Sequence, residues 1–267
     1  MPYLIGMDSI FPWENFDEFD AHSFYDSLRN GTVPKTFSVN PERYKEYFEP
    51  VFASGKDIVY VHFSRQMSGT LQNMAVALKE LKEIYSERKI YTIDTLAATC
   101  CARNIALAIS DLAKAGATAE ELVAWGQREV NHFAGFAVLD DLNYLVRGGR
   151  LPGYTGAIAN VLGIRPIVFI DTDGIIKSCG KVRSWRKAIR YLLEHMSLLS
   201  FDPEKYHVII AHSDAPEAAK ALANAVLKAY DGKPEIFIDD LSPTVGCHIG
   251  PGGVIISFYA RGRRCSK

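Results

Sequence analysis

Two arginines and two glycines stand together in the segment DDLNYLVRGGRL, residues 140–151. Arg147 and Arg150 carry permanent positive charge, and a guanidinium group matches the geometry of carboxylate or phosphate oxygens. Gly148 and Gly149 let the backbone turn tightly and approach a ligand. The segment therefore predicts an anion-binding site. The same residues also fit a helix C-cap with both arginines in solvent, and the sequence alone leaves both interpretations open.

Two hydroxyl side chains directly follow apolar segments that read as strands. Ser64 follows DIVYVHF, residues 57–63, and Thr95 follows KIYTID, residues 89–94. Because ligands gather beyond the carboxyl ends of parallel strands, we expect both hydroxyls at one sheet edge. A helix begins after each, and residues 68–70, Ser-Gly-Thr, add hydroxyls near a helix N-terminus, which favours a negative group. The prediction is a site for an anionic head group; the alternative is that these residues only cap helices.

His248 lies in CHIGPGG, residues 247–253, where we expect a loop that Pro251 stiffens and three glycines loosen. Such a loop can bring an imidazole to a site, although a lone histidine is more often structural. The sequence has no G-x-S-x-G, H-E-x-x-H, C-x-x-C or G-x-x-x-x-G-K-[ST] segment, so serine-hydrolase, zinc and nucleotide-phosphate chemistry lack their usual support. We therefore expect no metal and no cofactor.

Composition limits the class of protein. The chain has 267 residues, 48% of them hydrophobic, and a net charge of −1. This length fits two domains of about 100 to 200 residues, and the charge gives no general attraction to nucleic acid or anionic membranes. Five cysteines without framework spacing argue against a disulfide scaffold and for a reducing compartment, so we expect a cytoplasmic protein. No leader or membrane-spanning run is visible, and the ending RGRRCSK reads as a solvated basic tail.

The first half of the chain alternates strands and helices. Residues 57–63 and 89–94 are predicted strands, and residues 68–85 and 97–115 are predicted helices, which favours parallel pairing with right-handed crossovers. Thr118 and Glu121 have capping-box spacing at the start of a third helix that ends near residue 130, and GFAVLD, residues 135–140, continues the order as another strand. Before residue 57 we expect a short strand at residues 2–6, irregular chain and a helix.

After residue 150 the pattern changes. RPIVFI and GIIKSC flank an Asp-Gly turn signal at residues 173–174, which predicts a hairpin. A helix from 184 to 198, a strand at 207–212, a helix begun by Asp214 and Pro216, and strands at 235–240 and 254–259 follow. We therefore predict two α/β domains, residues 1–155 with a mainly parallel sheet and residues 156–267 with a mixed or antiparallel sheet and helices, and a ligand between them.

These motifs, taken together, resemble one family. The segments FSRQMSGT (63–70), IDT (93–95), DDLNYLVRGGRL (140–151), GIRPIV through KVRSWRKA (163–188) and CHIGPG (247–252) are similar in order and spacing to the DegV family of bacterial fatty-acid-binding proteins. The resemblance covers nearly the whole chain. It implies two α/β domains that hold one long-chain fatty acid between them, with the tail in an apolar tunnel.

The resemblance also implies roles for four residues. Ser64 and Thr95 match the positions that hold the fatty-acid carboxylate, although serine is commoner than threonine at the second. His248 matches the histidine near the head group, and Arg150 matches the arginine that closes the G-G-R turn. Family members present the fatty acid to a separate kinase that makes acyl phosphate for phospholipid synthesis. The expected protein is therefore a carrier and not itself the catalyst.

One departure from the family lies at the N-terminus. The family opens with a strand, a T-D-S-like turn and a helix, whereas MPYLIGMDSIFPW resembles the next segment, so we expect the usual first strand and helix to be missing. Two other functions stay open. One is an esterase or acyl transferase that uses Ser64 or Ser68 with His248, and the other is a regulatory module that responds to a bound lipid.

Overall fold

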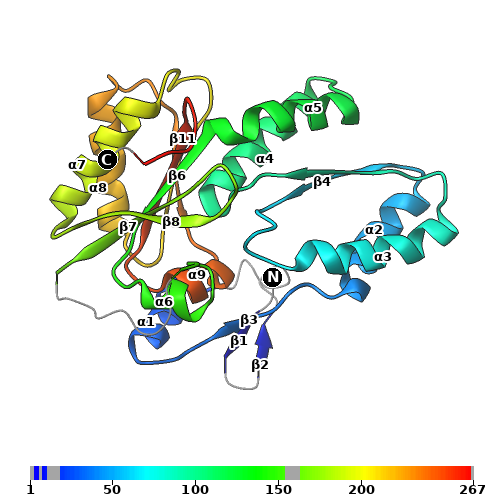
Figure 1. The fold of residues 1–267 in the computed structure, drawn as a ribbon, viewed down its shortest axis with the longest axis horizontal. Coiled ribbons are helices and arrows are strands. Elements are labelled where there is room, and N and C mark those ends of the chain that lie inside the picture. The colour runs from blue at the N-terminus through cyan, green and yellow to red at the C-terminus, as the bar shows by residue number, and fades with distance from the viewer. Residues whose placement is uncertain (1–2, 6–7, 11–18, 154–162, 266–267) are drawn as a thin grey trace.

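The computed structural model describes residues 3–5, 8–10, 19–153 and 163–265. It is an α/β structure with a small parallel sheet, a large mixed sheet and a short antiparallel sheet near the N-terminus, as predicted for the fold class. Helices cover both faces of the large sheet (Figure 1). A further pair of helices packs against the small sheet.

The small sheet pairs β4 (Ile58–His62) with β5 (Ile90–Asp94) in parallel, and α3 (Thr70–Ile84) makes the crossover between them. The register sets His62 opposite Asp94. Ser64 and Thr95 therefore leave the sheet at the same edge, as the sequence predicted. Helix α2 (Pro41–Ala53) packs on α3 around Tyr44, Phe48 and Leu81, which form a separate apolar cluster with the strand β4.

The large sheet has the strand order β10-β9-β11-β6-β7-β8. Its strands in chain order are β6 (Phe133–Val138), β7 (Arg165–Ile170), β8 (Ile176–Val182), β9 (Val208–His212), β10 (Ile236–Asp240) and β11 (Val254–Tyr259). Only β9 and β10 pair in parallel; the other neighbouring strands are antiparallel. One face packs against α7 (Trp185–Leu199) and α8 (Pro216–Ala229). The other face packs against α1 (Ala21–Arg29), α4 (Thr99–Lys114), α6 (Asn143–Arg147) and α9 (Pro243–Ile249).

Several local signals in the sequence are confirmed. Thr118 and Glu121 form the capping box of α5 (Ala119–Glu129), which leads through a 3₁₀ turn (Val130–His132) into β6. Ser184 caps α7 by accepting a hydrogen bond from the Lys187 backbone. The Asp-Gly signal forms the β7–β8 hairpin turn, and Gly174 adopts a φ of +81° there. Short-range patterns of this kind are set by neighbouring residues, so they survive in the fold.

Strand β6 differs from the prediction. Its place in the sequence suggested that it extends the parallel sheet of β4 and β5. Instead, β6 lies between β11 and β7 and is antiparallel to both. Every residue of β6 is buried, because helices cover both faces of the sheet at this position. Strand β6 thus lies on the N-terminal side of the predicted boundary between residues 1–155 and 156–267. The other strands of its sheet all lie on the C-terminal side.

The N-terminal region holds more structure than predicted. Three short strands, β1 (Tyr3–Ile5), β2 (Asp8–Ile10) and β3 (Lys35–Thr36), form an antiparallel sheet in the order β2-β1-β3. Asp20 caps α1 by accepting from the Ser23 backbone, and Asn40 caps α2 in the same way. The sequence indicated only one strand and one helix here. The other elements were missed because the aromatic and acidic composition of this region masks short elements.

The C-terminal segment corrects two predictions. Cys179 on β8 and Cys265 form a disulfide with Cα atoms 5.8 Å apart, although the spacing of the cysteines gave no sign of a pair. Arg263 is only 4% exposed, so this part of the expected basic tail is packed into the protein and not solvated. Cys265 and Arg263 both lie far in sequence from the residues that they contact, so only the fold brings these partners together. Cys100 and Cys101 are buried on α4, as expected for small core residues.

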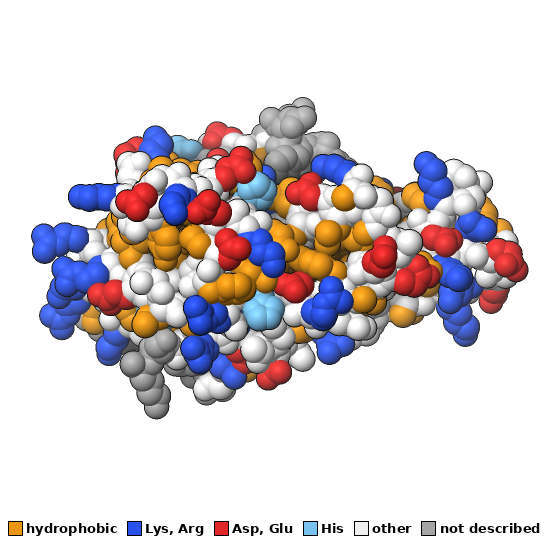
Figure 2. Space-filling model, turned by 90° about the horizontal axis from the view of Figure 1, so that it is seen from above, with side chains coloured by type: hydrophobic (Ala, Val, Ile, Leu, Met, Phe, Trp, Pro, Cys, Tyr) orange, Lys and Arg blue, Asp and Glu red, His pale blue; other side chains and the backbone are white. Residues whose placement is uncertain are grey.

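The surface mixes both signs of charge. Acidic and basic side chains are interspersed on the face seen from above, and apolar side chains gather near its middle (Figure 2). Among the described residues, no helix is long and apolar enough to cross a membrane.

Candidate functional site

Ser64 and Thr95 lie at the start of the two loops after β4 and β5, residues 63–69 and 95–98, which we call the strand-end loops. The Ser64 backbone N–H donates to Ala97 O over 2.7 Å, and the Thr95 N–H donates to His62 O over 2.8 Å. Thr95 Oγ1 also bonds to Ala97 at 3.3 Å. The side chains are 0% and 1% exposed. Both predicted hydroxyls are thus buried and hydrogen-bonded at one sheet edge.

The second strand-end loop is strained. Leu96 in this loop and Thr99, the first residue of α4, adopt φ angles of +49° and +54°, a region that β-branched and bulky residues rarely enter. Such conformations cost about 1–3 kcal/mol each and persist only where the surroundings fix them. The Leu96 N–H donates to Asp94 Oδ1 over 2.8 Å, which helps to hold this turn. Strain of this kind clusters at functional sites, which is independent support for a site at this edge.

Gly174 brings the β7–β8 hairpin to the strand-end loops. Ser64 Oγ donates a hydrogen bond of 2.8 Å to Gly174 O. A Cβ atom at position 174 would lie 2.3 Å from Ser64 Oγ and 3.1 Å from Leu96 Cα, so only glycine fits without displacement. The Asp-Gly signal predicted the turn, but no signal in the sequence predicted its contact with Ser64. Ser64 therefore lies at the seam between the small sheet and the large one.

Arg263 supports the same seam from the other side. Its guanidinium donates to Thr95 O over 3.0 Å, to Phe133 O over 2.7 Å, to Val130 O over 2.5 Å and to Leu96 O. Burial lowers the pKa of this guanidinium from its usual value. One buried cation thus joins the strand-end loops to β6. The sequence showed only a run of arginines, which does not reveal which one is buried.

His248 lies on helix α9 and not in the loop that we expected. The helix runs to Ile249, and Gly250 then takes a φ of +72°. A hydrogen bond of 2.8 Å joins His248 Nε2 to Thr36 Oγ1, so the imidazole is paired with Thr36 rather than with Ser64. Burial first, and the charge of Arg150 second, lower the pKa of His248 to about 4. At neutral pH this imidazole is uncharged.

The G-G-R turn lies against His248. Gly149 has a φ of +68° after α6, so the turn forms a helix C-cap, but only Arg147 of the two arginines is exposed to solvent. A Cβ atom at Gly148 would lie 2.2 Å from His248 Nδ1, so the absence of a side chain lets the imidazole approach. Arg150 is half-buried; its Nε donates to Met67 O over 3.1 Å, and its Nη1 donates to Gly148 O. Arg150 thus links this turn to the first strand-end loop.

A cavity of about 260 Å³, which we call the His248 pocket, opens beside this turn. Three basic residues contribute to its lining together with uncharged polar and aromatic ones: Lys35, Thr36, Tyr144, Arg147, Arg150 and His248. The Arg147 guanidinium lies 4.6 Å from the centre of the Tyr144 ring. A pocket with this lining favours an anion.

A smaller apolar cavity of about 40 Å³ lies beside the second strand-end loop. Ala98 and Thr99 of that region line one side, and the other side is formed by apolar residues of the large sheet and α9: Phe136, Val168, Phe169, Ile176, Ile249 and Ile255. An apolar space therefore begins within a few residues of Thr95.

The four predicted residues form two groups. Ser64 and Thr95 share the backbone of Ala97, whereas Arg150 and His248 share the His248 pocket. The bond from Arg150 to Met67 O connects the groups through the first strand-end loop. Sequence reasoning missed Gly174, Arg263 and Thr36, whose contributions depend on contacts between segments more than 100 residues apart.

Comparison with known proteins agrees with this architecture. The sequence profile of the DegV family, described as "Uncharacterised protein, DegV family", matches residues 13–261. The chain therefore belongs to the DegV family. It is 30% identical over 246 residues to a DegV domain-containing protein of Clostridium perfringens, an alignment that covers 92% of this chain and 84% of that protein.

Solved structures give the same fold. A protein of Streptococcus agalactiae, described as a fatty acid binding DegV family protein, superposes with a TM-score of 0.80 at 25% identity, covering 97% of this chain and 89% of that one. The Fatty Acid Kinase B3 protein of Streptococcus pneumoniae, solved with linoleic acid, superposes with a TM-score of 0.84 at 18% identity, covering 97% and 89%. The second likeness shows a shared fold.

Proposed function

We propose that this protein binds one long-chain fatty acid and holds its carboxylate at the strand-end loops. The observation that carries the proposal is the pair of buried hydroxyls, Ser64 and Thr95, at one edge of a parallel sheet and next to an apolar cavity. The fatty acid binding described for the Streptococcus agalactiae relative supports the ligand class.

In this proposal the hydroxyls orient the head group. A hydrogen bond to a charged acceptor contributes about 1.5–3 kcal/mol, twice the usual value for neutral pairs. The Ser64 proton is now donated to Gly174 O, so it must turn to the carboxylate when the ligand binds. We therefore expect the β7–β8 hairpin to shift slightly on binding. Arg150 supplies positive charge nearby, and neutral His248 orients Thr36.

The tail supplies most of the affinity. Burying an acyl chain gains about 0.8 kcal/mol per methylene, which for a sixteen-carbon acid sums to roughly 10 kcal/mol before association costs. A cavity of about 40 Å³ holds only a small part of such a chain. We therefore propose that the apolar side chains lining this cavity separate as the tail enters between the small and large sheets.

Delivery to a kinase is the finer part of the proposal. Family resemblance supports a role in which the bound fatty acid is presented to a fatty acid kinase that forms acyl phosphate for phospholipid synthesis. The protein is then a cytoplasmic carrier and the kinase performs the chemistry. A direct test is whether the loaded protein, mixed with a purified fatty acid kinase and ATP, yields acyl phosphate when neither protein does so alone.

The head-group assignment is tested with the double variant Ser64→Ala plus Thr95→Ala. We expect its affinity for a long-chain fatty acid to fall by about 2–4 kcal/mol, roughly 30-fold or more, because two donors to a charged acceptor are lost. Thr92→Ala, an exposed threonine on β5, is the matched control and should bind normally. Unchanged affinity in the double variant rejects the head-group site, whereas a wild-type protein that binds no fatty acid rejects the ligand class.

A further inference from the structure

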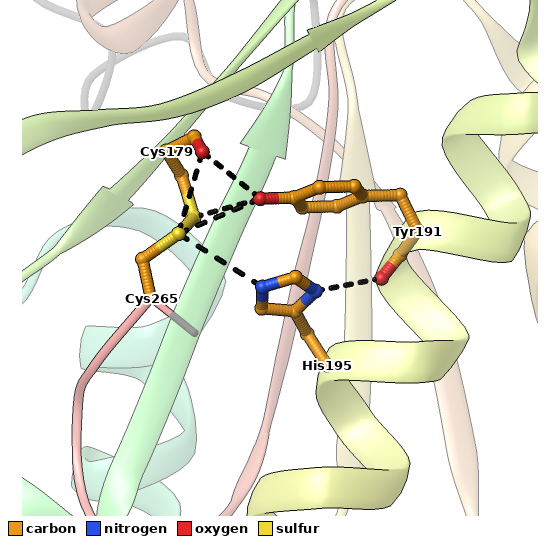
Figure 3. The surroundings of a disulfide bond; sticks show 4 residues. All are labelled: Cys179, Tyr191, His195 and Cys265. Carbon is orange, nitrogen blue, oxygen red and sulfur yellow. Dashed lines mark hydrogen bonds between the residues drawn. A yellow bond between two sulfur atoms is a disulfide. The ribbon is translucent and has the colours of Figure 1, made fainter. Parts of the chain in front are cut away.

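Three potential metal ligands lie together on the face of the large sheet that α7 and α8 cover. They are Cys179 on β8, His195 on α7 and Cys265 after β11, and their ligand atoms all lie within 4.8 Å of one another. In Figure 3 the imidazole of His195 points one nitrogen at the sulfur atoms and the other at the backbone of α7. Neither the predicted fatty-acid site nor the kinase role uses these residues.

The hydrogen bonds of His195 fix its tautomer. Nδ1 lies 3.0 Å from the carbonyl oxygen of Tyr191, which only accepts, so Nδ1 carries the proton. Nε2 therefore presents its lone pair, and it faces Cys265 Sγ at 3.9 Å. The ring is 5% exposed and stacks on Tyr191 with centroids 4.1 Å apart. A histidine that ligates a metal is typically held in this way, with the other ring nitrogen bonded to a carbonyl.

The distances are close to those of a tetrahedral site. Zinc bonds of about 2.3 Å to sulfur and 2.0 Å to nitrogen place neighbouring ligand atoms about 3.5–3.8 Å apart. The separation of 3.9 Å between Cys265 and His195 almost meets this value. The two sulfur atoms must move apart, and the ligand atoms, which now lie within 4.8 Å of one another, must close to tetrahedral spacing. With Cα atoms 5.8 Å apart, these changes need side-chain rotation rather than a change of fold.

We propose that Cys179, His195 and Cys265 bind one soft divalent cation, best matched by zinc, when their disulfide is reduced. Two small thiols supply the two electrons and become a disulfide themselves, leaving two protein thiols. The cation then replaces the two thiol protons, which pass to solvent. A water or the Tyr191 hydroxyl, 3.1 Å from Cys179 Sγ, takes the fourth position. Disulfide and metal exclude each other because they use the same sulfur atoms.

The site fastens the C-terminal segment in either state. Cys265 follows Arg263 by two residues, and Arg263 donates to Thr95 O and Leu96 O at the strand-end loops. A closed site therefore holds this arginine in place, both as a disulfide and as a metal complex. In the reduced and metal-free state this fastening is absent, and the hydrogen bonds of Arg263 hold the segment.

Cobalt titration tests the proposal, with wild-type protein reduced by a phosphine and desalted without oxygen. We expect one Co²⁺ per chain, thiolate-to-cobalt charge-transfer absorption, and displacement of that absorption by Zn²⁺. Oxidised wild-type protein is the matched control and should give no such band. Because this comparison needs no substitution, it decides the question even if a variant fails to fold. Reduced protein without the band overturns the proposal.

Variants then assign the ligands. Cys179→Ser and Cys265→Ser should each abolish the charge-transfer band, and His195→Gln should weaken cobalt binding by roughly tenfold or more. Cys100→Ser, which changes a buried free thiol elsewhere, should keep the full spectrum. A band that survives in both Cys179→Ser and Cys265→Ser places the metal elsewhere and also overturns the proposal.

Discussion

The strand-end loops and the His248 pocket are two polar regions of this protein, and they satisfy their polar groups in different ways. In the strand-end loops, Ser64 and Thr95 are buried and bonded to backbone oxygens of the protein itself. The His248 pocket has a volume of about 260 Å³ and three basic residues in its lining. The hydroxyls of the first region are buried and uncharged, whereas the second region is a cavity with basic side chains in its lining.

This difference separates two tasks that a single anion site would combine. Neutral donors at a fixed edge define where a carboxylate sits, because a hydrogen bond is directional. Positive charge in an open pocket attracts an anion over a longer range and tolerates several positions. If the proposed function holds, we expect the strand-end loops to orient the carboxylate and the His248 pocket to attract it. Substitutions in the first region should change stability and affinity strongly, and those in the second should act mildly.

The largest effect is expected for Arg263→Met. The change removes the donors to four buried carbonyl oxygens that join the strand-end loops to β6, so the free energy of unfolding should fall by about 4 kcal/mol. Urea unfolding measures the loss. Arg264→Met, at an exposed neighbour, should stay within about 0.5 kcal/mol. Equal stability of the two variants would mean that the strand-end loops do not depend on this arginine.

The next effect is expected for Gly174→Ala. The new methyl group collides with Ser64, and the alanine backbone must adopt a left-handed conformation. The collision and the backbone strain together should lower the free energy of unfolding by about 3 kcal/mol. Gly149→Ala has a similar φ of +68° but open space around it, so it should lose only about 1 kcal/mol. Thermal or urea unfolding compares the two. A larger loss at Gly149 would contradict the close seam at Ser64.

A pH dependence is expected from His248. Its pKa is lowered from 6.5 to about 4 in the folded protein, so between these values the unfolded chain binds a proton that the folded chain does not. Stability should therefore fall as the pH drops from 7 to 4, by about 2 kcal/mol after allowance for partial exposure. His248→Asn should lose correspondingly less than wild type over this range. Parallel profiles for the two proteins would contradict the buried neutral imidazole.

The smallest effect is expected for Arg147→Met in the His248 pocket. Its guanidinium stacks on Tyr144, a contact that contributes about 0.5–1 kcal/mol at an exposed site. We expect the fatty acid to associate more slowly at low salt, with little change in dissociation. Stopped-flow binding at two ionic strengths measures this. A strong rise in the dissociation rate would mean that Arg147 holds the bound carboxylate in place and does not only attract it. That result would weaken the contrast between the strand-end loops and the His248 pocket.

Local chemistry made much of the fold predictable. The capping box at Thr118, the cap at Ser184 and the Asp-Gly hairpin depend on residues within four positions of each other. The shared edge of Ser64 and Thr95 followed from one crossover unit with parallel strands. Such features are decided before distant segments meet, so a single sequence contains them.

The errors have the opposite origin. Strand β6 reads like its predecessors but pairs with β11, which lies more than 100 residues later. His248 lies on a short helix, α9, because Pro243 favours a helix start at this point. The three later glycines end this helix and do not form a loop around His248. Gly174, Arg263 and the pair Cys179–Cys265 acquire their contacts through packing between remote segments. Residue type alone does not encode these partners.

Native mass spectrometry of the purified protein, mixed with a long-chain fatty acid, tests the central claim most directly. We predict one fatty acid per chain in the wild-type protein, and loss of that complex in Ser64→Ala plus Thr95→Ala with the fold retained. A well-folded wild-type protein that carries no fatty acid, or a double variant that retains it fully, would contradict the assignment of the strand-end loops as the head-group site.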